Sequence, residues 1–214
     1  MTPFNILRDA LYFFTRHLTS LLALCLPWLA LESIVRYQVM LQAGQEAGLW
    51  EMLAGLLFYP IYTGSLIMFL SARSHGVVPS ITALWGDAIR LWPRFAILAG
   101  LTAGMVVLGF SLMIIPGFLI MVKFAFAEPL LVLRGLPPLQ ALRISFERTR
   151  GHFLTLLACI MVTLLPAWML DAWITSHFMA EPVVMIALQS LSGMLQLLLT
   201  IAVFRLFMMT DSDN

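Results

Sequence analysis

The chain has 214 residues, of which 61% are hydrophobic and only 11% are charged, and its mean hydropathy is +0.96. A soluble domain has about 45–50% apolar and about 25% charged residues, so this chain lacks the polar surface that would cover a water-exposed globule. Two cysteines exclude a disulfide-rich secreted scaffold, and a net charge of +1 excludes a polybasic nucleic-acid-binding protein. The composition predicts an all-α polytopic membrane protein with a single integral membrane domain over residues 1–214.

Six apolar segments approach or exceed the roughly 20 residues that a helix needs to cross a bilayer. They are residues 18–41, 52–72, 95–115, 118–133, 153–173 and 183–204. Only Pro116 and Gly117 separate the third segment from the fourth, and this pair predicts a tight turn and a helical hairpin. The alternative, one long bent helix, would reach about twice the thickness of the hydrocarbon core.

The basic residues predict the orientation of the spans, because cytoplasmic loops carry the excess of Lys and Arg. Ten of the 12 basic residues flank the spans on one side: Arg8, Arg16, Arg73, Arg90, Arg94, Arg134, Arg143, Arg148, Arg150 and Arg205. The opposite side carries Glu46, Glu51, Asp171 and Glu181 but no Lys or Arg. We therefore expect a multi-pass membrane protein with both termini in the cytoplasm.

Three segments that precede the predicted hairpins have the apolar spacing of amphipathic helices. They are residues 4–18, 80–93 and 139–153. We expect all three to lie in the cytoplasmic membrane interface. Basic side chains there would contact anionic lipid headgroups, and the candidates are Arg90, Arg94, Arg143, Arg148 and Arg150.

The amphipathic segments divide the chain into three units, residues 1–73, 79–134 and 137–208. A shift of 58 residues aligns Pro79, Ala83, Leu84, Arg90, Phe95 and Leu98 with Pro137, Ala141, Leu142, Arg148, Phe153 and Leu156. We interpret the units as quasi-repeats of an amphipathic helix followed by a helical hairpin. The alternative is that amphipathic helices followed by apolar helices resemble one another without any repeat.

A charged residue within a predicted span costs about 2.5–3.5 kcal/mol at the membrane centre and so needs a partner or a function. Glu32 and Arg36 are four residues apart, on one helix face, and can pair. Lys123 and Glu128 are five residues apart, point in different directions and need separate partners. These residues either clamp the bundle together or line a pathway for protons, a substrate or a lipid headgroup.

Small and polar residues recur at helical spacing on one face of the sixth span and on one face of the third span. Gln189, Gly193, Gln196 and Thr200 form one stripe of the sixth span, which either joins helices by hydrogen bonds or lines a wet cavity. Gly100 and Gly104 form a G-x-x-x-G pattern, which predicts a close-packing face on the third span.

No motif indicates a catalytic, cofactor-binding or metal-binding residue. His17, His75, His152 and His177 lie at the edges of the spans, and neither an H-E-x-x-H pattern nor a Walker A pattern occurs. We expect no enzyme and no cofactor.

A group of residues across the middle of the chain carries a family resemblance. It consists of Pro116-Gly117, Lys123, Pro129, Gly135, Ala141-Leu142, Ser145, Arg150-Gly151 and Phe153. This arrangement resembles the YciC-like family of uncharacterised bacterial inner-membrane proteins, and also the six-span membrane domains fused to some glycerophosphodiesterases. The resemblance implies a polytopic inner-membrane protein tied to envelope or lipid homeostasis, and it implies no catalytic residue.

Two functions are consistent with the sequence. The first is a non-enzymatic inner-membrane protein that organises lipids or envelope partners, with a homo-oligomer left open. The alternative is a small transporter or channel that uses Lys123, Glu128 and the polar stripe of the sixth span. A dry, packed centre would favour the first, and a polar cleft that reaches Glu128 would favour the second.

Overall fold

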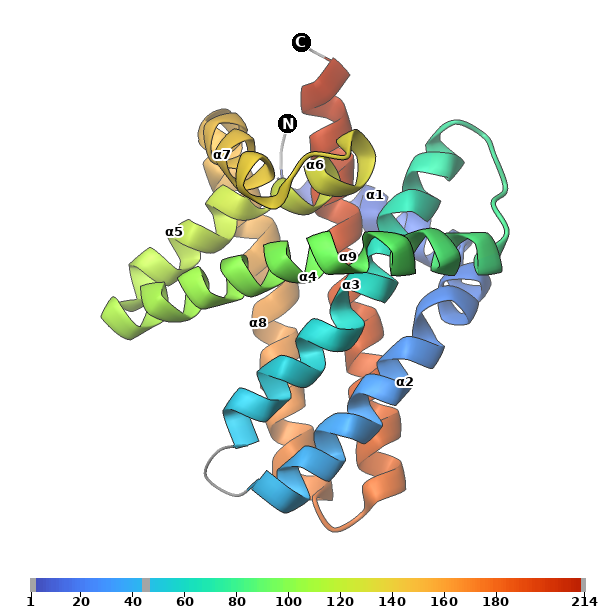
Figure 1. Cartoon of the computed structure of the whole chain (residues 1–214), viewed down its shortest axis with the longest axis vertical. Helices are drawn as coiled ribbons and strands as arrows, with labels where there is room; N and C mark the ends of the chain where they lie inside the picture. The colour runs from blue at the N-terminus through green and yellow to red at the C-terminus, as the bar shows by residue number, and fades with distance from the viewer. Residues whose placement is uncertain (1–2, 44–46, 213–214) are drawn as a thin grey trace.

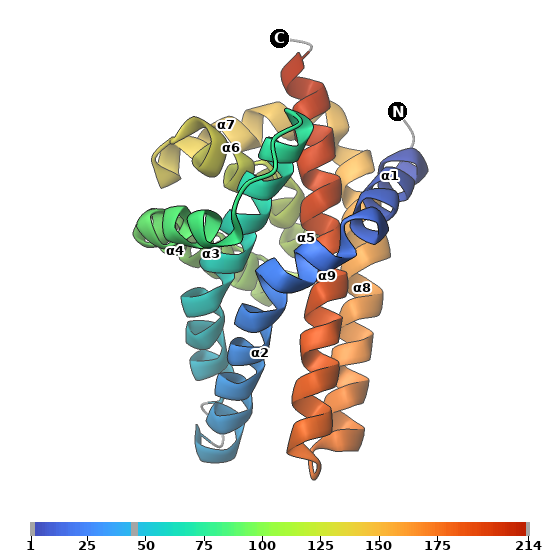
Figure 2. The ribbon, with the colours of Figure 1, turned by 90° about the vertical axis from the view of Figure 1, so that its right-hand side faces the viewer.

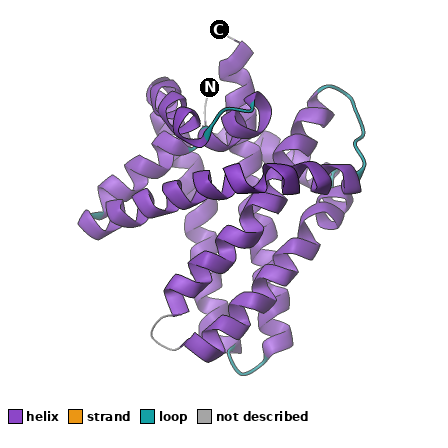
Figure 3. Ribbon diagram, in the orientation of Figure 1, coloured by secondary structure: helices purple, strands orange, loops and turns teal. Residues whose placement is uncertain are grey.

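A computed structural model describes residues 3–43 and 47–212, which form helices joined by short turns, with no strand among them (Figure 3). The elements are α1 (Pro3–Arg16), α2 (Leu18–Ala43), α3 (Ala47–Ser74), α4 (Ile81–Leu112), α5 (Ile114–Phe124), α6 (Ala127–Arg134), α7 (Pro138–Arg148), the 3-10 helix η2 (Thr149–His152), α8 (Phe153–Phe178) and α9 (Pro182–Ser212). Within the described residues, six helical segments are long and apolar enough to cross a membrane, as the sequence predicts. Glu46 lies outside the described residues.

Four of the long helices, α2, α3, α8 and α9, form an upright bundle. Helix α2 packs against α3, α8 packs against α9, and contacts between α2 and α9 join the two pairs. Both ends of the chain lie at one end of this bundle, while the last turns of α2 and α8 lie at the other (Figures 1 and 2). The buried core is almost entirely aliphatic and aromatic, with Leu21, Leu66, Phe126 and Ile201 among its least exposed members.

Helix α4 is longer than the sequence predicts. The segment 80–93, predicted as a separate interfacial helix, and the span 95–115 are one continuous helix that passes through Pro93. Ser80 caps its start by accepting a hydrogen bond from the Ala83 N–H. The indole N–H groups of Trp85 and Trp92 donate to the carbonyl oxygens of Leu24 (3.0 Å) and Leu57 (2.8 Å). The first half of α4 is therefore held against α2 and α3.

The turn of the α4–α5 hairpin lies at Met113, so its predicted position at Pro116-Gly117 was wrong. Pro116 and Gly117 belong to the first turn of α5. Proline is tolerated there, because the first N–H groups of a helix have no partner within the helix. A Cβ at Gly109 would lie 2.9 Å from the Gly117 Cα, so these two glycines let α4 and α5 approach each other closely. The predicted face at Gly104 has no neighbouring atom of the described chain within 4 Å of such a Cβ.

The fourth predicted span is broken into α5 and α6 at Ala125 and Phe126. Pro129 contributes to the break, since its ring clashes with a helical carbonyl four residues earlier, at Ala125. Ser145 of α7 occupies the gap: its hydroxyl donates to the Lys123 carbonyl (2.7 Å) and accepts from the Phe126 N–H (3.1 Å). A fully buried serine thus satisfies the backbone groups that the break releases.

The first amphipathic segment forms α1. The third forms α7 together with the 3-10 helix η2. Helix α1 buries Ile6, Ala10 and Phe14, while Phe4, predicted on its apolar face, is 73% exposed. Helix α7 buries Ala141, Leu142 and Ser145. The location of both helices at a membrane interface stays a prediction, as does the division into three quasi-repeats. The first and third units each supply two upright helices, whereas the second supplies the α4–α5 hairpin.

Candidate functional site

The described part of the chain contains two adjoining cavities inside the apolar helices. The larger, which we call the polar cavity, has a volume of about 540 Å³ and lies among α2, α3, α8 and α9. Four charged side chains line it: Glu32, Arg36, Glu51 and Asp171. Because charges are expensive within a span, their gathering around one cavity marks this place as the candidate site.

Glu32 and Arg36 form the ion pair that their spacing on α2 predicts. Arg36 Nη2 lies 2.5 Å from Glu32 Oε1, and the Glu32 residue is only 4% exposed. A Cβ at Gly55 of α3 would lie 3.1 Å from Arg36 Nη2, so the glycine leaves room for the pair between the helices. The second carboxylate oxygen, Glu32 Oε2, is buried, and the Tyr62 hydroxyl is a neighbouring hydrogen-bonding group of this carboxylate.

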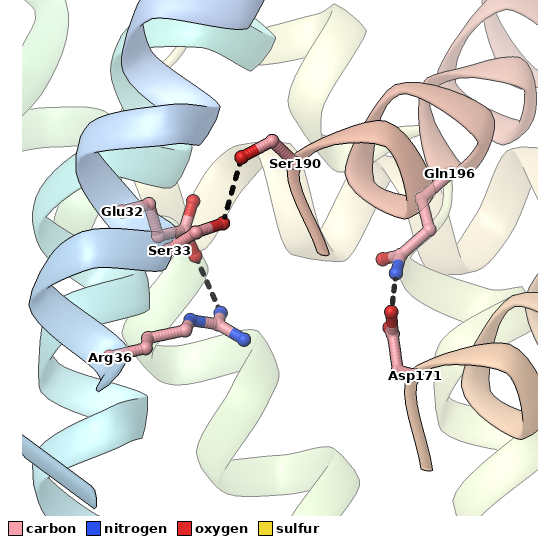
Figure 4. Close-up of polar contacts among 6 residues, drawn as sticks. All are labelled: Glu32, Ser33, Arg36, Asp171, Ser190 and Gln196. Carbon is pink, nitrogen blue, oxygen red and sulfur yellow. Dashed lines mark hydrogen bonds and ion pairs between the residues drawn. The ribbon is translucent and has the colours of Figure 1, made fainter. Parts of the chain in front are cut away.

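Asp171 faces this pair from the other side of the polar cavity (Figure 4). Gln196 of α9 donates a hydrogen bond to Asp171 Oδ2 at 2.8 Å. Nearer α2, the hydroxyl groups of Ser33 and Ser190 are 3.3 Å apart and join α2 to α9. Sequence reasoning placed Asp171 among the loop residues and missed it as a site residue. The available signal was that Asp171 lies near the end of the fifth predicted span, which directly precedes the sixth span and its polar stripe.

The second cavity, which we call the apolar cavity, has a volume of about 310 Å³ and lies between the bundle and the α4–α5 hairpin. Its lining is mainly aliphatic and aromatic, and includes Val106 of α4, Leu164 of α8 and Leu197 of α9. Its one charged side chain among the described residues is Glu128 of α6, which accepts a hydrogen bond from the Tyr59 hydroxyl at 2.5 Å. A carboxyl group and a phenol therefore meet inside a mainly apolar chamber.

The two cavities share Tyr62, Gly193 and Gln196 as lining residues. The predicted stripe on α9 thus runs along both of them, with Gln189 in the polar cavity and Thr200 in the apolar one. Such an arrangement offers charged and hydrogen-bonding groups at one end and an apolar space at the other. It matches the chemistry of an amphipathic molecule.

Lys123 lies apart from both cavities. Its ammonium group lies over the aromatic rings of Phe146 (4.9 Å) and Phe153 (5.9 Å), which are contributed by α7 and α8. Aromatic faces attract cations. The structure therefore places Lys123 with α7 and the start of α8, and it does not bring Lys123 together with Glu128.

The candidate lipid-contacting arginines lie on α4, α7 and η2. Arg90, Arg94, Arg143 and Arg150 are exposed, and Arg148 is partly buried. Arg90 lies 3.7 Å from Asp87 and Arg143 lies 3.7 Å from Glu147, in exposed pairs that hold their side chains weakly.

These features define the class of the protein: a multi-pass α-helical membrane protein with polar side chains gathered inside its apolar helices. The chain belongs to the UPF0259 family, described as an uncharacterised protein family, which matches residues 37–209. A UPF0259 membrane protein of Sodalis glossinidius (strain morsitans) is 26% identical over 194 residues, which cover 90% of this chain and 76% of the relative. No solved structure matches the chain. The YciC-like resemblance stays a prediction, since the family description does not carry that name.

Proposed function

We propose that the protein binds an amphipathic molecule of the membrane, in the first place a lipid, across the two cavities, and so organises lipid within the bilayer. The observation that carries this proposal is the sharing of Tyr62, Gly193 and Gln196 by a charged chamber and an apolar chamber. A headgroup in the polar cavity and an acyl chain in the apolar cavity would each meet matching groups. An ion or a small polar solute would find no matching groups in the apolar cavity.

The charges of the polar cavity indicate the kind of headgroup. Three carboxylates, from Glu32, Glu51 and Asp171, face one guanidinium, from Arg36, so negative charge exceeds positive charge. A headgroup with a protonated amine would supply the missing positive charge.

Native mass spectrometry tests this proposal on protein released from nanodiscs made of equal amounts of phosphatidylethanolamine and phosphatidylglycerol. Val106→Trp fills the apolar cavity, while Val107→Trp adds the same bulk to the neighbouring, exposed position on α4. We expect wild type and Val107→Trp to retain one phosphatidylethanolamine, and Val106→Trp to lose it. Equal retention by both variants, or no retained lipid in wild type, would contradict the proposal.

A second candidate function, transport coupled to protons, rests on the Tyr59–Glu128 hydrogen bond at the end of the apolar cavity. A carboxyl inside a span is a common element of proton pathways. The test is proton flux into proteoliposomes under an imposed membrane potential, compared between wild type and Glu128→Gln. Flux in wild type that disappears in Glu128→Gln would favour transport, and equal flux in the two would leave lipid binding as the better account.

We also propose that the protein lies in a bacterial inner membrane with both termini in the cytoplasm, where the exposed arginines of α4, α7 and η2 contact anionic lipids. Ten of the 12 basic residues support this orientation through their position on one side of the spans. Protease removal of a tag at each terminus from inside-out vesicles, but not from right-side-out vesicles, is the expected result. Protection in inside-out vesicles would contradict it.

A further inference from the structure

The α4–α5 hairpin does not run parallel to the upright bundle. Figure 1 shows α4 crossing the direction of α2, α3, α8 and α9, and Figure 2, turned by 90°, shows the same helix nearly end-on. Two helices that both cross a bilayer in a bundle follow roughly the same axis, with tilts of about 20° on average. The orientation of α4 departs clearly from that arrangement.

The tip of the hairpin carries no group that would hold it in water. Residues 95–122 contain no Asp, Glu, Lys or Arg. Leu112, Met113, Ile114 and Ile115, which form the turn, are 70–77% exposed. By contrast, the α8–α9 turn contains Glu181, and the segment between α2 and α3 contains Gln45 and Glu46. A turn that crossed to the far surface would expose four large apolar side chains to water and headgroups.

The backbone of the tip is partly satisfied. The Met113 N–H donates to the Gly109 carbonyl at 3.0 Å, and the Ser111 hydroxyl donates to the Val107 carbonyl at 2.9 Å. Pro116 falls in the first turn of α5, where an N–H would otherwise lack an acceptor. Met113 provides no side-chain cap for α5, so the polar groups left unpaired are confined to the two helix ends that meet there.

The charges at the base of the hairpin lie where its two arms begin and end. Arg90 and Arg94 precede the uncharged stretch, and Lys123 and Arg134 follow it. All four would stay on the side of the termini whether the hairpin crossed the bilayer or turned back within it. The distribution of basic residues, from which the orientation of the spans was predicted, therefore does not distinguish the two arrangements.

We propose that α4 and α5 form a re-entrant hairpin, which enters the bilayer from the side that bears the termini and returns to it, with the Met113 turn among the acyl chains. Only α2, α3, α8 and α9 then cross the membrane. The partner of the exposed apolar surface of the hairpin is the hydrocarbon of the lipids. This inference is independent of what the cavities bind.

Cysteine accessibility in sealed vesicles of both orientations tests the topology. On a background with Cys25→Ala and Cys159→Ala, three single variants are compared: Val78→Cys before α4, Met113→Cys at the hairpin turn and Ala180→Cys at the α8–α9 turn. A membrane-impermeant maleimide should label Val78→Cys from one side and Ala180→Cys from the other. Met113→Cys should be labelled from neither side, and should react fully once the protein is denatured in detergent.

Labelling of Met113→Cys from the side of Ala180→Cys would show two full crossings and overturn the proposal. Labelling from the side of Val78→Cys would also overturn it, because the tip would then lie outside the bilayer. If Met113→Cys does not accumulate in the membrane, Ile115→Cys, 76% exposed in the same turn, serves in its place with the same expected and contradicting results.

Discussion

The upright bundle and the α4–α5 hairpin are both strongly apolar, yet they differ in where they carry charge. Burial does not separate them, because the most apolar stretches of α8 in the bundle and of α4 in the hairpin are both 22% buried inside the protein. The bundle holds charged side chains between its helices, and the hairpin has no charged residue over residues 95–122. Apolar length alone therefore does not tell a helix that crosses the bilayer from one that rests within it.

The bundle is most sensitive at its buried ion pair. Arg36→Leu would leave the Glu32 carboxylate buried without its partner, and we expect the free energy of unfolding to fall by about 3 kcal/mol. This value is at the low end for buried pairs because Arg36 is half exposed. Thermal unfolding in nanodiscs measures the loss of stability. The double variant Glu32→Leu/Arg36→Leu should recover most of the loss. Arg143→Leu, which removes an exposed pair, should change little, and an equal loss there would contradict the assigned role.

The hairpin is most sensitive where its two helices touch. Gly109→Ala would place a Cβ 2.8 Å from Ile120 Cδ1 and 2.9 Å from the Gly117 backbone, and we expect a destabilisation of about 2 kcal/mol from overpacking. Gly104→Ala, with no neighbouring atom within 4 Å of the added Cβ, is the matched control on the same helix. Unfolding of both variants by detergent titration should separate them. Equal stability of the two would argue against the close approach at Gly109.

The joint between hairpin and bundle depends on Ser145. Ser145→Ala would leave the Phe126 N–H and the Lys123 carbonyl without this partner, and the expected loss is about 1–2 kcal/mol. Ser111→Ala, whose hydroxyl bonds only within the exposed surface of α4, should be close to neutral. Hydrogen exchange at Phe126 is the sharper readout, since exchange should quicken there in Ser145→Ala alone. Unchanged protection would contradict the bridging role.

The smallest effect concerns pH at the start of the bundle. Burial lowers the pKa of His17, between α1 and α2, below its ordinary value of 6.5, and the nearby Arg73 and Arg16 lower it further. The unfolded chain then binds the proton more readily than the folded protein, so this contribution to stability is complete above pH 6.5 and is lost as the pH falls below it. Melting temperatures of wild type should decline over that range more steeply than those of His17→Gln. Parallel profiles would contradict the assignment.

Much of the fold could be predicted from the sequence, because apolar length and charge asymmetry are local properties. The six apolar helices and the Glu32–Arg36 pair follow directly from spacing. The turn at Met113 could not be predicted in the same way. Pro116-Gly117 is a strong turn signal in a sequence, but a proline is equally compatible with the first turn of a helix, where the structure places it. The continuity of α4 through Pro93 was also missed, because it depends on contacts with distant parts of the chain. Trp85 and Trp92 hold the first half of α4 against α2 and α3.

The candidate site was harder to predict, because it is assembled from helices far apart in the chain. Gln189 and Gln196 stood out as a stripe, and the structure lines both cavities with that stripe. Asp171 had no local signal beyond its position near the end of a span, and only the packing of α8 on α9 places it opposite Gln196. Tyr59, 69 residues from Glu128 in the chain, could not be paired with it by spacing.

The most direct measurement for the whole account is a cryo-electron microscopy map of the protein in a lipid nanodisc. A bound antibody fragment would make the particle large enough for this method. We expect α2, α3, α8 and α9 to cross the disc, the Met113 turn to stay inside it, and an elongated density to extend from Asp171 past Tyr62 toward Glu128. A map in which α4 and α5 both reach the far surface and pack against α8, with no space left between them, would contradict the account.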